Sequence, residues 1–219
     1  LFGVQGTVDG PFPTHYEPVE SPFKNLLYKQ IDSPAVRYFE GPLNELCHAP
    51  SHEFPIVACT FRLTEHYLSG PMSRFDSWLN ELQPAMFAEL SPELAMERGI
   101  EHGGWMVVRS PRGEIEARAM VTRRLRPLLV QGETVHQIGL PFHWGYAGEV
   151  VGSQANDLTS LVADPNVSMH EGKVFVCDVR PGRLPPNLRP RPTEPVAARP
   201  LGGLAPNTAP QAQAEGREQ

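Results

Sequence analysis

The sequence predicts a mainly β protein built around a closed barrel, with a few short helices. The chain has 24 prolines and 19 glycines among 219 residues, which is high for a helical bundle and favours strands joined by loops. Short apolar or alternating runs of strand length also recur from residue 54 to residue 179, separated by turn signals. Many short strands with little helix are typical of a sheet that closes into a barrel.

The predicted strands follow from apolar runs and from alternation. Residues 114–122 alternate apolar side chains with mostly charged ones, so one face should be buried and the other exposed. Ser-Pro-Arg-Gly at 110–113 predicts a hairpin before this strand, and a turn at 131–133 predicts a second strand pair. The predicted strands are residues 54–61, 86–90, 105–109, 114–122, 128–130, 135–140 and 173–179.

Two short helices are expected. Residues 72–82 place Phe75, Trp78, Leu79 and Leu82 at helical spacing, and the following proline ends that helix. The second helix has signals at both ends, with Ser91 as N-cap, Pro92 at the first position and Gly99 as the stop.

The composition divides the chain into three parts. Residues 1–50 are rich in proline, glycine and aromatics without a sustained period, and we expect an extended arm that lies on another surface. Residues 51–180 hold the predicted strands and form the barrel. Residues 181–219 lose nearly all large apolar side chains and are expected to be a disordered Pro/Ala-rich tail.

Charge and cysteine content exclude several classes. A formal net charge of −6 argues against a nucleic-acid-binding face. The cysteines Cys47, Cys59 and Cys177 lie far apart, so no iron–sulfur cluster or zinc ribbon is expected in this chain, and we expect them in the core. No apolar run is long enough to span a bilayer. The start at Leu1 has neither methionine nor signal peptide, which suggests a processed product or a piece of a longer polypeptide.

The common catalytic and nucleotide-binding motifs are missing from the sequence. It contains no G-x-G-x-x-G, no Walker-type loop, no G-x-S-x-G and no H-E-x-x-H. His48 and His52 have the spacing of a helical metal site, but Pro50 between them makes a helix improbable, so no metal site is predicted.

Polar and aromatic residues gather where predicted strands end. Arg-Leu-Thr-Glu-His-Tyr at 62–67 follows the first strand, and its Arg62, Thr64 and His66 could grip a phosphate or stack on a flat ring. The alternative is a capped strand end with a surface pair between Arg62 and Glu65.

A second group follows the predicted strand at 135–140. Phe142 and His143 stand beside a tryptophan and a glycine, and aromatic faces with polar neighbours suit a planar heterocycle. Asn156 and Lys173 could add an amide and a cation. The alternatives are a core histidine, a turn-capping asparagine and an ordinary exposed lysine.

These motifs occur together in an order that resembles the formate dehydrogenase large-subunit family. The likeness is carried by Arg-Leu-Thr-Glu-His at 62–66, the helix at 72–82, the Arg-Gly turn at 110–113 and Pro-Phe-His-Trp-Gly at 141–145. It continues with Ala-Asn-Asp-Leu-Thr at 155–159 and Lys173, and residues 9–18 resemble the family segment upstream.

The resemblance implies a six-stranded double-psi β-barrel that closes over a bis(molybdopterin guanine dinucleotide) cofactor carrying Mo or W. Carried over by position, Arg62, Thr64 and His66 would contact one dinucleotide. Phe142, His143 and Asn156 would line the pterin side, and Lys173 would donate to the cofactor. No catalytic residue and no metal ligand of the family matches this chain, so the chain alone should not oxidise formate.

The implied partners supply what this chain lacks. They are the N-terminal part of the formate dehydrogenase catalytic subunit, which would hold the metal and share the cofactor, and an iron–sulfur electron-transfer subunit. The resemblance leaves periplasm and cytoplasm open and slightly favours the periplasm. Alternatives are the same role in another bis-pterin oxidoreductase such as nitrate reductase, and a non-catalytic barrel for partner binding or cofactor insertion.

Overall fold

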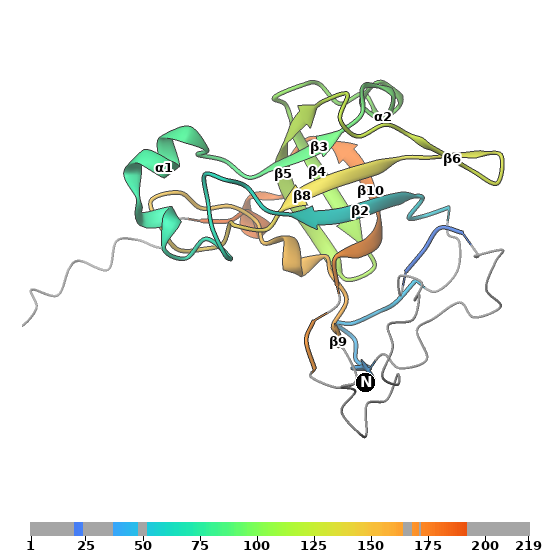
Figure 1. The fold of residues 1–219 in the computed structure, drawn as a ribbon, viewed down its shortest axis with the longest axis horizontal. Helices are drawn as coiled ribbons and strands as arrows, with labels where there is room; N and C mark the ends of the chain where they lie inside the picture. The colour runs from blue at the N-terminus through green and yellow to red at the C-terminus, as the bar shows by residue number, and fades with distance from the viewer. Residues whose placement is uncertain (1–19, 24–36, 48–51, 164–167, 171, 192–219) are drawn as a thin grey trace, which may run out of the picture.

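A closed barrel forms the centre of the molecule (Figure 1). The computed structural model describes residues 20–23, 37–47, 52–163, 168–170 and 172–191. Within these residues, six strands close in the order β10, β2, β8, β3, β5, β4, which confirms the mainly β barrel with short helices. The strands are β2 Ile56–Phe61, β3 Phe87–Leu90, β4 Trp105–Ser110, β5 Gly113–Val121, β8 Gln137–Pro141 and β10 Val174–Pro181.

Two neighbouring pairs in the barrel run parallel, and this decides which loops meet. β2 pairs with β8 in parallel, from Val57 opposite Gln137 to Phe61 opposite Pro141. β3 pairs with β5 in parallel as well, whereas the remaining neighbours are antiparallel. Since parallel strands end at the same edge, the segments that follow β2 and β8 leave the barrel side by side.

Side chains from all six strands fill the barrel. In β5 the predicted alternation places Ile115, Ala117 and Ala119 inside, where each is almost fully buried. Trp105 to Ser110 and Gly113 to Val121 form the predicted hairpin. The largest fully buried apolar side chains are Ile56, Leu90, Leu94, Met106, Ile115, Ile138, Leu140, Leu158 and Phe175.

Helix α2, Pro92–Arg98, has the predicted ends. The Ser91 hydroxyl accepts a hydrogen bond from the N–H of Leu94 at 3.1 Å, so it caps the first turn. Gly99 ends the helix with a φ of 64°, a left-handed conformation that glycine adopts without steric cost.

The single helix predicted over 72–82 is wrong, because the segment breaks into two turns. A 3₁₀ turn, η1 Ser73–Phe75, is followed by α1 Ser77–Leu82. Asp76 separates them with extended backbone, and its carboxylate accepts hydrogen bonds from the N–H groups of Trp78 and Leu79. A side chain that caps a new helix in this way competes with continuing the old one.

The strand pair predicted from 128–130 and 135–140 is also wrong in its second member. β6 Leu128–Val130 pairs with β7 Glu133–Val135. The turn residues Gln131 and Gly132 both have positive φ, as a tight two-residue hairpin turn requires, so the hairpin takes up residues 133–135. β8 then pairs with β2 and β3 within the barrel.

Glu116 departs from the predicted charged, exposed face of β5. Its side chain is buried and accepts hydrogen bonds from Arg183 at 2.6 Å and from the N–H of Leu184 at 3.0 Å. The segment after β10 therefore folds back on the barrel, with a 3₁₀ turn η3 at Pro186–Leu188. Residues 182–191, part of the predicted tail, are thus described beside the barrel, and the rest of that tail lies outside the described residues.

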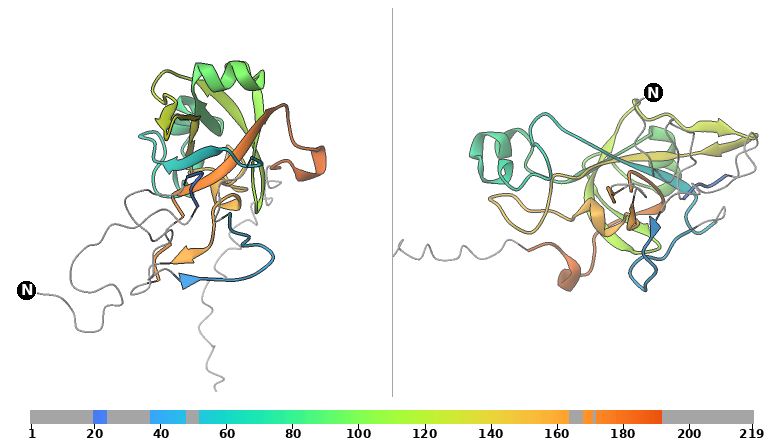
Figure 2. Two further views of the ribbon diagram at one scale, coloured as in Figure 1. Left: turned by 90° about the vertical axis from the view of Figure 1, so that its right-hand side faces the viewer. Right: turned by 60° about the horizontal axis from the view of Figure 1, so that its bottom comes forward.

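Only parts of the predicted arm are described, and these parts lie on the barrel's own flank. β1 Arg37–Tyr38 pairs with β9 Val162–Ala163 outside the barrel (Figure 2). Residues 1–19, 24–36 and 48–51 lie outside the described residues, so packing of the arm on another chain stays a prediction. In the described part of the chain, no helix is long and apolar enough to cross a bilayer.

Candidate functional site

The two aromatic and cationic motifs meet at one edge of the barrel, where β2 and β8 end and β10 begins; we call this edge the rim. Arg62 follows β2 and Phe142 follows β8. The guanidinium carbon of Arg62 lies 3.5 Å from the centroid of the Phe142 ring. That ring stacks on the imidazole of His143, with centroids 5.2 Å apart and planes at 20°. The parallel pairing thus builds a stack of three flat groups from motifs far apart in sequence.

His143 is the innermost member of this stack and is fully buried. Its Nε2 accepts a hydrogen bond from the N–H of Leu63 at 2.8 Å, so the neutral ring carries its proton on Nδ1. Burial lowers the pKa of His143 below its ordinary value of 6.5. The backbone of Leu68 lies close enough to raise the pKa of His143 in part. It does not reach hydrogen-bond geometry, so Nδ1 has no hydrogen-bond partner among the described residues. His143 is therefore a neutral acceptor that joins the two motifs.

His66 is also fully buried, and both of its ring nitrogens are hydrogen-bonded. Nδ1 lies 3.0 Å from the Ser73 hydroxyl, and Nε2 lies 2.9 Å from the carbonyl oxygen of Gln83. These bonds fix the segment after β2 to both ends of the α1 region. The ring has no nitrogen left for a ligand in this arrangement.

Lys173 and Thr64 reach the same rim with exposed side chains. The carbonyl of Lys173 accepts a hydrogen bond from the N–H of Thr60 at 3.0 Å, which places the lysine beside the end of β2. Among the described residues, neither Arg62 nor Lys173 forms an ion pair with a carboxylate. Two cations at one edge, without a carboxylate partner among the described residues, suit an anionic ligand such as a pyrophosphate.

Asn156 lies farther along this end of the molecule, on η2 Ala155–Asp157. Its side chain is exposed, and its carbonyl accepts a hydrogen bond from the Thr159 hydroxyl at 3.2 Å. The η2 turn packs on the tip of the β4–β5 hairpin, where Arg112 donates a 2.8 Å hydrogen bond to the Leu158 carbonyl. The amide is thus presented by a short turn whose position depends on this hairpin.

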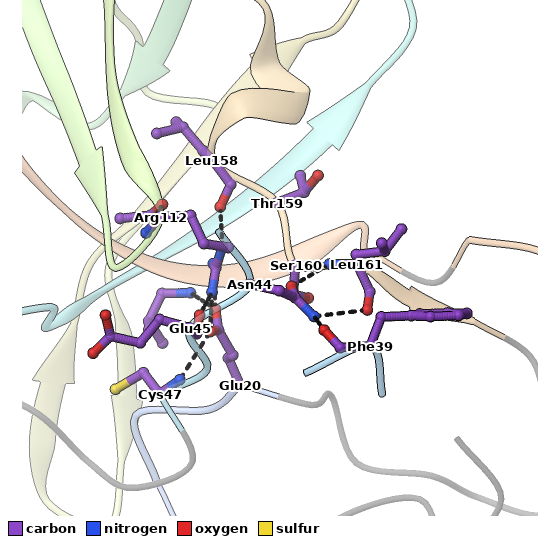
Figure 3. A network of polar contacts seen from close by, with 12 residues as sticks. Glu20, Phe39, Asn44, Glu45, Cys47, Arg112, Leu158, Thr159, Ser160 and Leu161 are labelled. Atoms are coloured by element: carbon purple, nitrogen blue, oxygen red, sulfur yellow. Dashed lines mark hydrogen bonds and ion pairs between the residues drawn. The ribbon is translucent and has the colours of Figure 1, made fainter. Parts of the chain in front are cut away.

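A buried ion pair fixes the hairpin tip to the N-terminal region (Figure 3). Arg112 donates to both carboxylate oxygens of Glu20, at 2.6 and 2.9 Å, and the side chains are 2% and 0% exposed. Glu20 also accepts hydrogen bonds from the N–H groups of Cys47 at 3.0 Å and Val176 at 3.2 Å. All these donors leave the carboxylate charge well compensated, as a buried charge requires.

Asn44 makes a second contact from the N-terminal region, here to Leu161 in the segment after η2 (Figure 3). Its amide nitrogen donates to the carbonyls of Phe39 at 2.8 Å and Leu161 at 3.0 Å. Its amide oxygen accepts from the N–H of Leu161 at 2.6 Å. Arg112 at Leu158 and Asn44 at Leu161 therefore hold the stretch that directly follows Asn156.

Arg74 joins the segment after β2 to the segment after β8. Its Nη1 donates to the carbonyls of His143 at 2.5 Å and Ser69 at 2.8 Å, and its Nε donates to Ala147 at 2.6 Å. Burial lowers the pKa of Arg74, while Tyr146 opposes this effect. This buried cation adds to the positive potential near His143.

The structure brings most of the predicted residues together, and it adds three that the motifs did not reveal. Arg62, Thr64, His66, Phe142, His143 and Lys173 gather at the rim, and Asn156 lies on the neighbouring turn. The added residues are Glu20, Arg74 and Arg112. Arg112 lies in the predicted hairpin turn at 110–113, but a turn motif does not indicate that its arginine is buried.

Two hollows among the described residues lie away from the rim residues. Two pockets among the described residues are lined by Pro22, Phe23, His52, Pro55 and 133–135 in one case, and by Ala85, Met86, Trp105, Glu116, 151–153, Arg183 and Pro190 in the other. The described residues also contain no group of three or more His, Cys, Asp or Glu that could hold a metal ion. The rim with its exposed cations is therefore the candidate site.

Comparison with known proteins gives a consistent result. A family model described as "Molydopterin dinucleotide binding domain" matches residues 56–176, more than half of the chain. Formate dehydrogenase 2 subunit alpha (cytochrome c-553) of Nitratidesulfovibrio vulgaris is 42% identical over 80% of this chain and 17% of its own length. The formate dehydrogenase subunit alpha of Megalodesulfovibrio gigas is 38% identical over 82% of this chain and 18% of its own.

A third relative is the nitrate-inducible formate dehydrogenase major subunit of Escherichia coli, 41% identical over 82% of this chain and 18% of its own length. The chain thus spans less than a fifth of the length of these three relatives. The match of the family model covers the whole run from β2 into β10, including every predicted site residue. The chain therefore belongs to the molybdopterin dinucleotide-binding domain family.

Proposed function

We propose that this chain is the cofactor-binding C-terminal part of a formate dehydrogenase catalytic subunit. It would close over a bis(molybdopterin guanine dinucleotide) carrying Mo or W while another part of the subunit holds the metal. When bound, this group would supply the redox chemistry that converts formate to CO₂, a proton and two electrons. The proposal is supported by the family membership and by the similarity to formate dehydrogenase subunits, and periplasm and cytoplasm both fit it.

One observation carries the proposal at the level of residues, namely the stack of Arg62 on Phe142 beside Lys173. A pterin dinucleotide combines flat rings with polar edges and a pyrophosphate. Arg62 and Lys173 present cations that have no carboxylate partner among the described residues, and Phe142 presents a partly exposed ring. This combination of groups fits the ligand.

The seven predicted residues then divide into two kinds. Arg62, Thr64, Phe142, Asn156 and Lys173 have exposed or partly exposed side chains and would contact the cofactor. His66 and His143 are fully buried, so in this arrangement they would position those side chains instead of touching the cofactor. We infer that His143 sets the distance between the two motifs through Leu63 and Phe142.

The test is cofactor retention in the assembled enzyme. Arg62→Gln and Lys173→Gln should each lower the pterin and the Mo or W content per catalytic subunit, measured by mass spectrometry of the extracted cofactor and by elemental analysis. Arg123→Gln is the matched control. Arg123 is exposed and follows the C-terminal end of β5, which lies at the end of the barrel opposite the rim. Full pterin content in both rim variants would overturn the residue assignment.

The substrate is tested in the same preparation. The assembled enzyme should oxidise formate and should not reduce nitrate, and the chain alone should do neither. Nitrate reduction would favour the other bis-pterin oxidoreductases. An assembled complex that contains this chain but neither pterin nor Mo or W would favour a non-catalytic barrel.

A further inference from the structure

The segment that leaves the barrel after β2 has its polar side inward and its apolar side outward. We call residues 67–83 the α1 lobe; it stands to one side of the barrel in Figure 1 and in the right-hand view of Figure 2. Its buried side chains include Ser73, Arg74 and Asn80. Its exposed large side chains are Tyr67, Leu68, Met72, Phe75, Trp78 and Leu82.

This orientation is enforced by polar contacts, so the apolar side cannot simply turn inward. Asn80 donates to the carbonyl of Arg74 at 2.9 Å and to the carboxylate of Glu149 at 3.0 Å. Glu149 also accepts from the Ser77 hydroxyl at 3.0 Å. Together these bonds hold α1 so that Trp78, 83% exposed, and Leu82, 69% exposed, face outward.

An apolar surface of this composition is typical of a protein interface. Tryptophan, tyrosine, phenylalanine and methionine are the residues enriched at the centres of interfaces, whereas isolated exposed apolar residues need no explanation. Here four exposed residues of these types and two exposed leucines come from one segment of 17 residues. The exposed charges within the lobe are Asp76 and Glu81, both acidic, while its cation Arg74 is buried. The matching surface should therefore be apolar with basic residues at its edge.

We propose that the α1 lobe is the surface on which the remainder of the catalytic subunit packs. The inference rests on the proposed function. Two observations select this occupant. The chain spans less than a fifth of the length of its three relatives, so a subunit of that length has a much larger remainder to supply a partner surface. The lobe is also continuous with the rim, since Tyr67 directly follows the segment 62–66 and Arg74 binds the His143 carbonyl.

A photo-crosslinking experiment in the assembled enzyme tests the identity of the occupant. Trp78→p-benzoylphenylalanine should crosslink to parts of the catalytic subunit that lie outside the 219 residues. Met96→p-benzoylphenylalanine is the matched control, because Met96 is 82% exposed on α2 and does not belong to the lobe. Crosslinks from position 78 only to a second copy of this chain or to the iron–sulfur subunit, or none at all, would overturn the proposal.

A second variant measures how much the surface contributes. Trp78→Asp should raise the hydrogen-exchange rate of the α1 amides in the assembled enzyme by about tenfold or more, as loss of a central interface tryptophan does. Met96→Asp should leave that rate unchanged. Equal rates in the Trp78→Asp and wild-type enzymes would overturn the inference. Pterin content, measured alongside, separates the two claims: crosslinks as expected without any pterin would refute the proposed function and leave the interface standing.

Discussion

The backbone N–H of Leu63 donates a 2.8 Å hydrogen bond to Nε2 of His143, two residues that are 80 positions apart. This bond joins the segment after β2 to the segment after β8. Because the bond needs an unprotonated Nε2, the neutral form of the imidazole is part of the folded structure.

The first prediction concerns pH. Burial lowers the pKa of His143 in the folded chain, so below its ordinary value of 6.5 the unfolded chain binds a proton that the folded chain resists. Stability should therefore fall as pH drops through 6.5, by at most about 1.4 kcal/mol per pH unit from this residue. In His143→Gln the amide oxygen can still accept from Leu63, but that pH dependence should be lost.

Urea unfolding of wild type and variant at several pH values from neutral to mildly acidic measures the effect. The control is His52→Gln, at an exposed histidine. Its free energy of unfolding should change with pH as that of the wild type does. Identical slopes for His143→Gln and wild type would contradict the role given to His143.

Replacing Arg74 by lysine, which keeps the positive charge, should still lower the stability of the fold. It donates three hydrogen bonds to carbonyls of residues 69, 143 and 147, and a lysine cannot reproduce that planar geometry. We expect Arg74→Lys to lower the free energy of unfolding by roughly 1–3 kcal/mol, since buried carbonyls lose their donors. Chemical denaturation measures this, and Arg123→Lys should change stability by less than about 0.5 kcal/mol. An unaltered unfolding midpoint in Arg74→Lys would show that these bonds contribute little.

The Glu20–Arg112 pair should show strong coupling. Glu20→Leu or Arg112→Met alone leaves one charge buried without its partner and should cost about 3–5 kcal/mol. The double variant removes both charges and should cost much less than the sum of the two single variants. A double-mutant cycle by chemical denaturation measures the coupling, and additive effects would argue against a direct pair.

Any side chain at Gly70 should clash with the backbone of His143 and lower the stability of the fold. Its φ is +82°, and an added Cβ would lie 1.9 Å from the carbonyl oxygen of His143. Gly103 has a similar φ of +76°, but a Cβ there meets nothing within 4 Å. Gly103→Ala should therefore cost only the backbone strain, about 1 kcal/mol, and Gly70→Ala should cost at least two to three times as much. Similar losses on thermal unfolding in both variants would show that the loop gives way.

Local signals were sufficient for most of the barrel. The hairpin at 110–113, the caps of α2 at Ser91 and Gly99, and the buried apolar face of β5 are predicted and confirmed, because each depends on neighbours within a few residues. The two wrong predictions concern element boundaries, which one or two residues decide through a side-chain cap or a backbone angle. Asp76 started a second helix, and positive φ at Gln131 and Gly132 shortened a hairpin.

The sequence by itself determined the strands, the two motifs and the family that they resemble, because periodicity, turn chemistry and motif order are properties of the chain alone. Only the tertiary structure decided which polar groups are buried. His66, His143, Arg74, Arg112, Glu20 and Glu116 look in sequence like surface or ligand-binding residues, yet each is buried or nearly so with partners far along the chain. The cost of burying a charge or an imidazole depends on donors and acceptors that the fold supplies, and a sequence pattern does not contain them. The same holds for the α1 lobe, whose helical spacing predicted an apolar face but not that polar contacts with Glu149 would turn it outward.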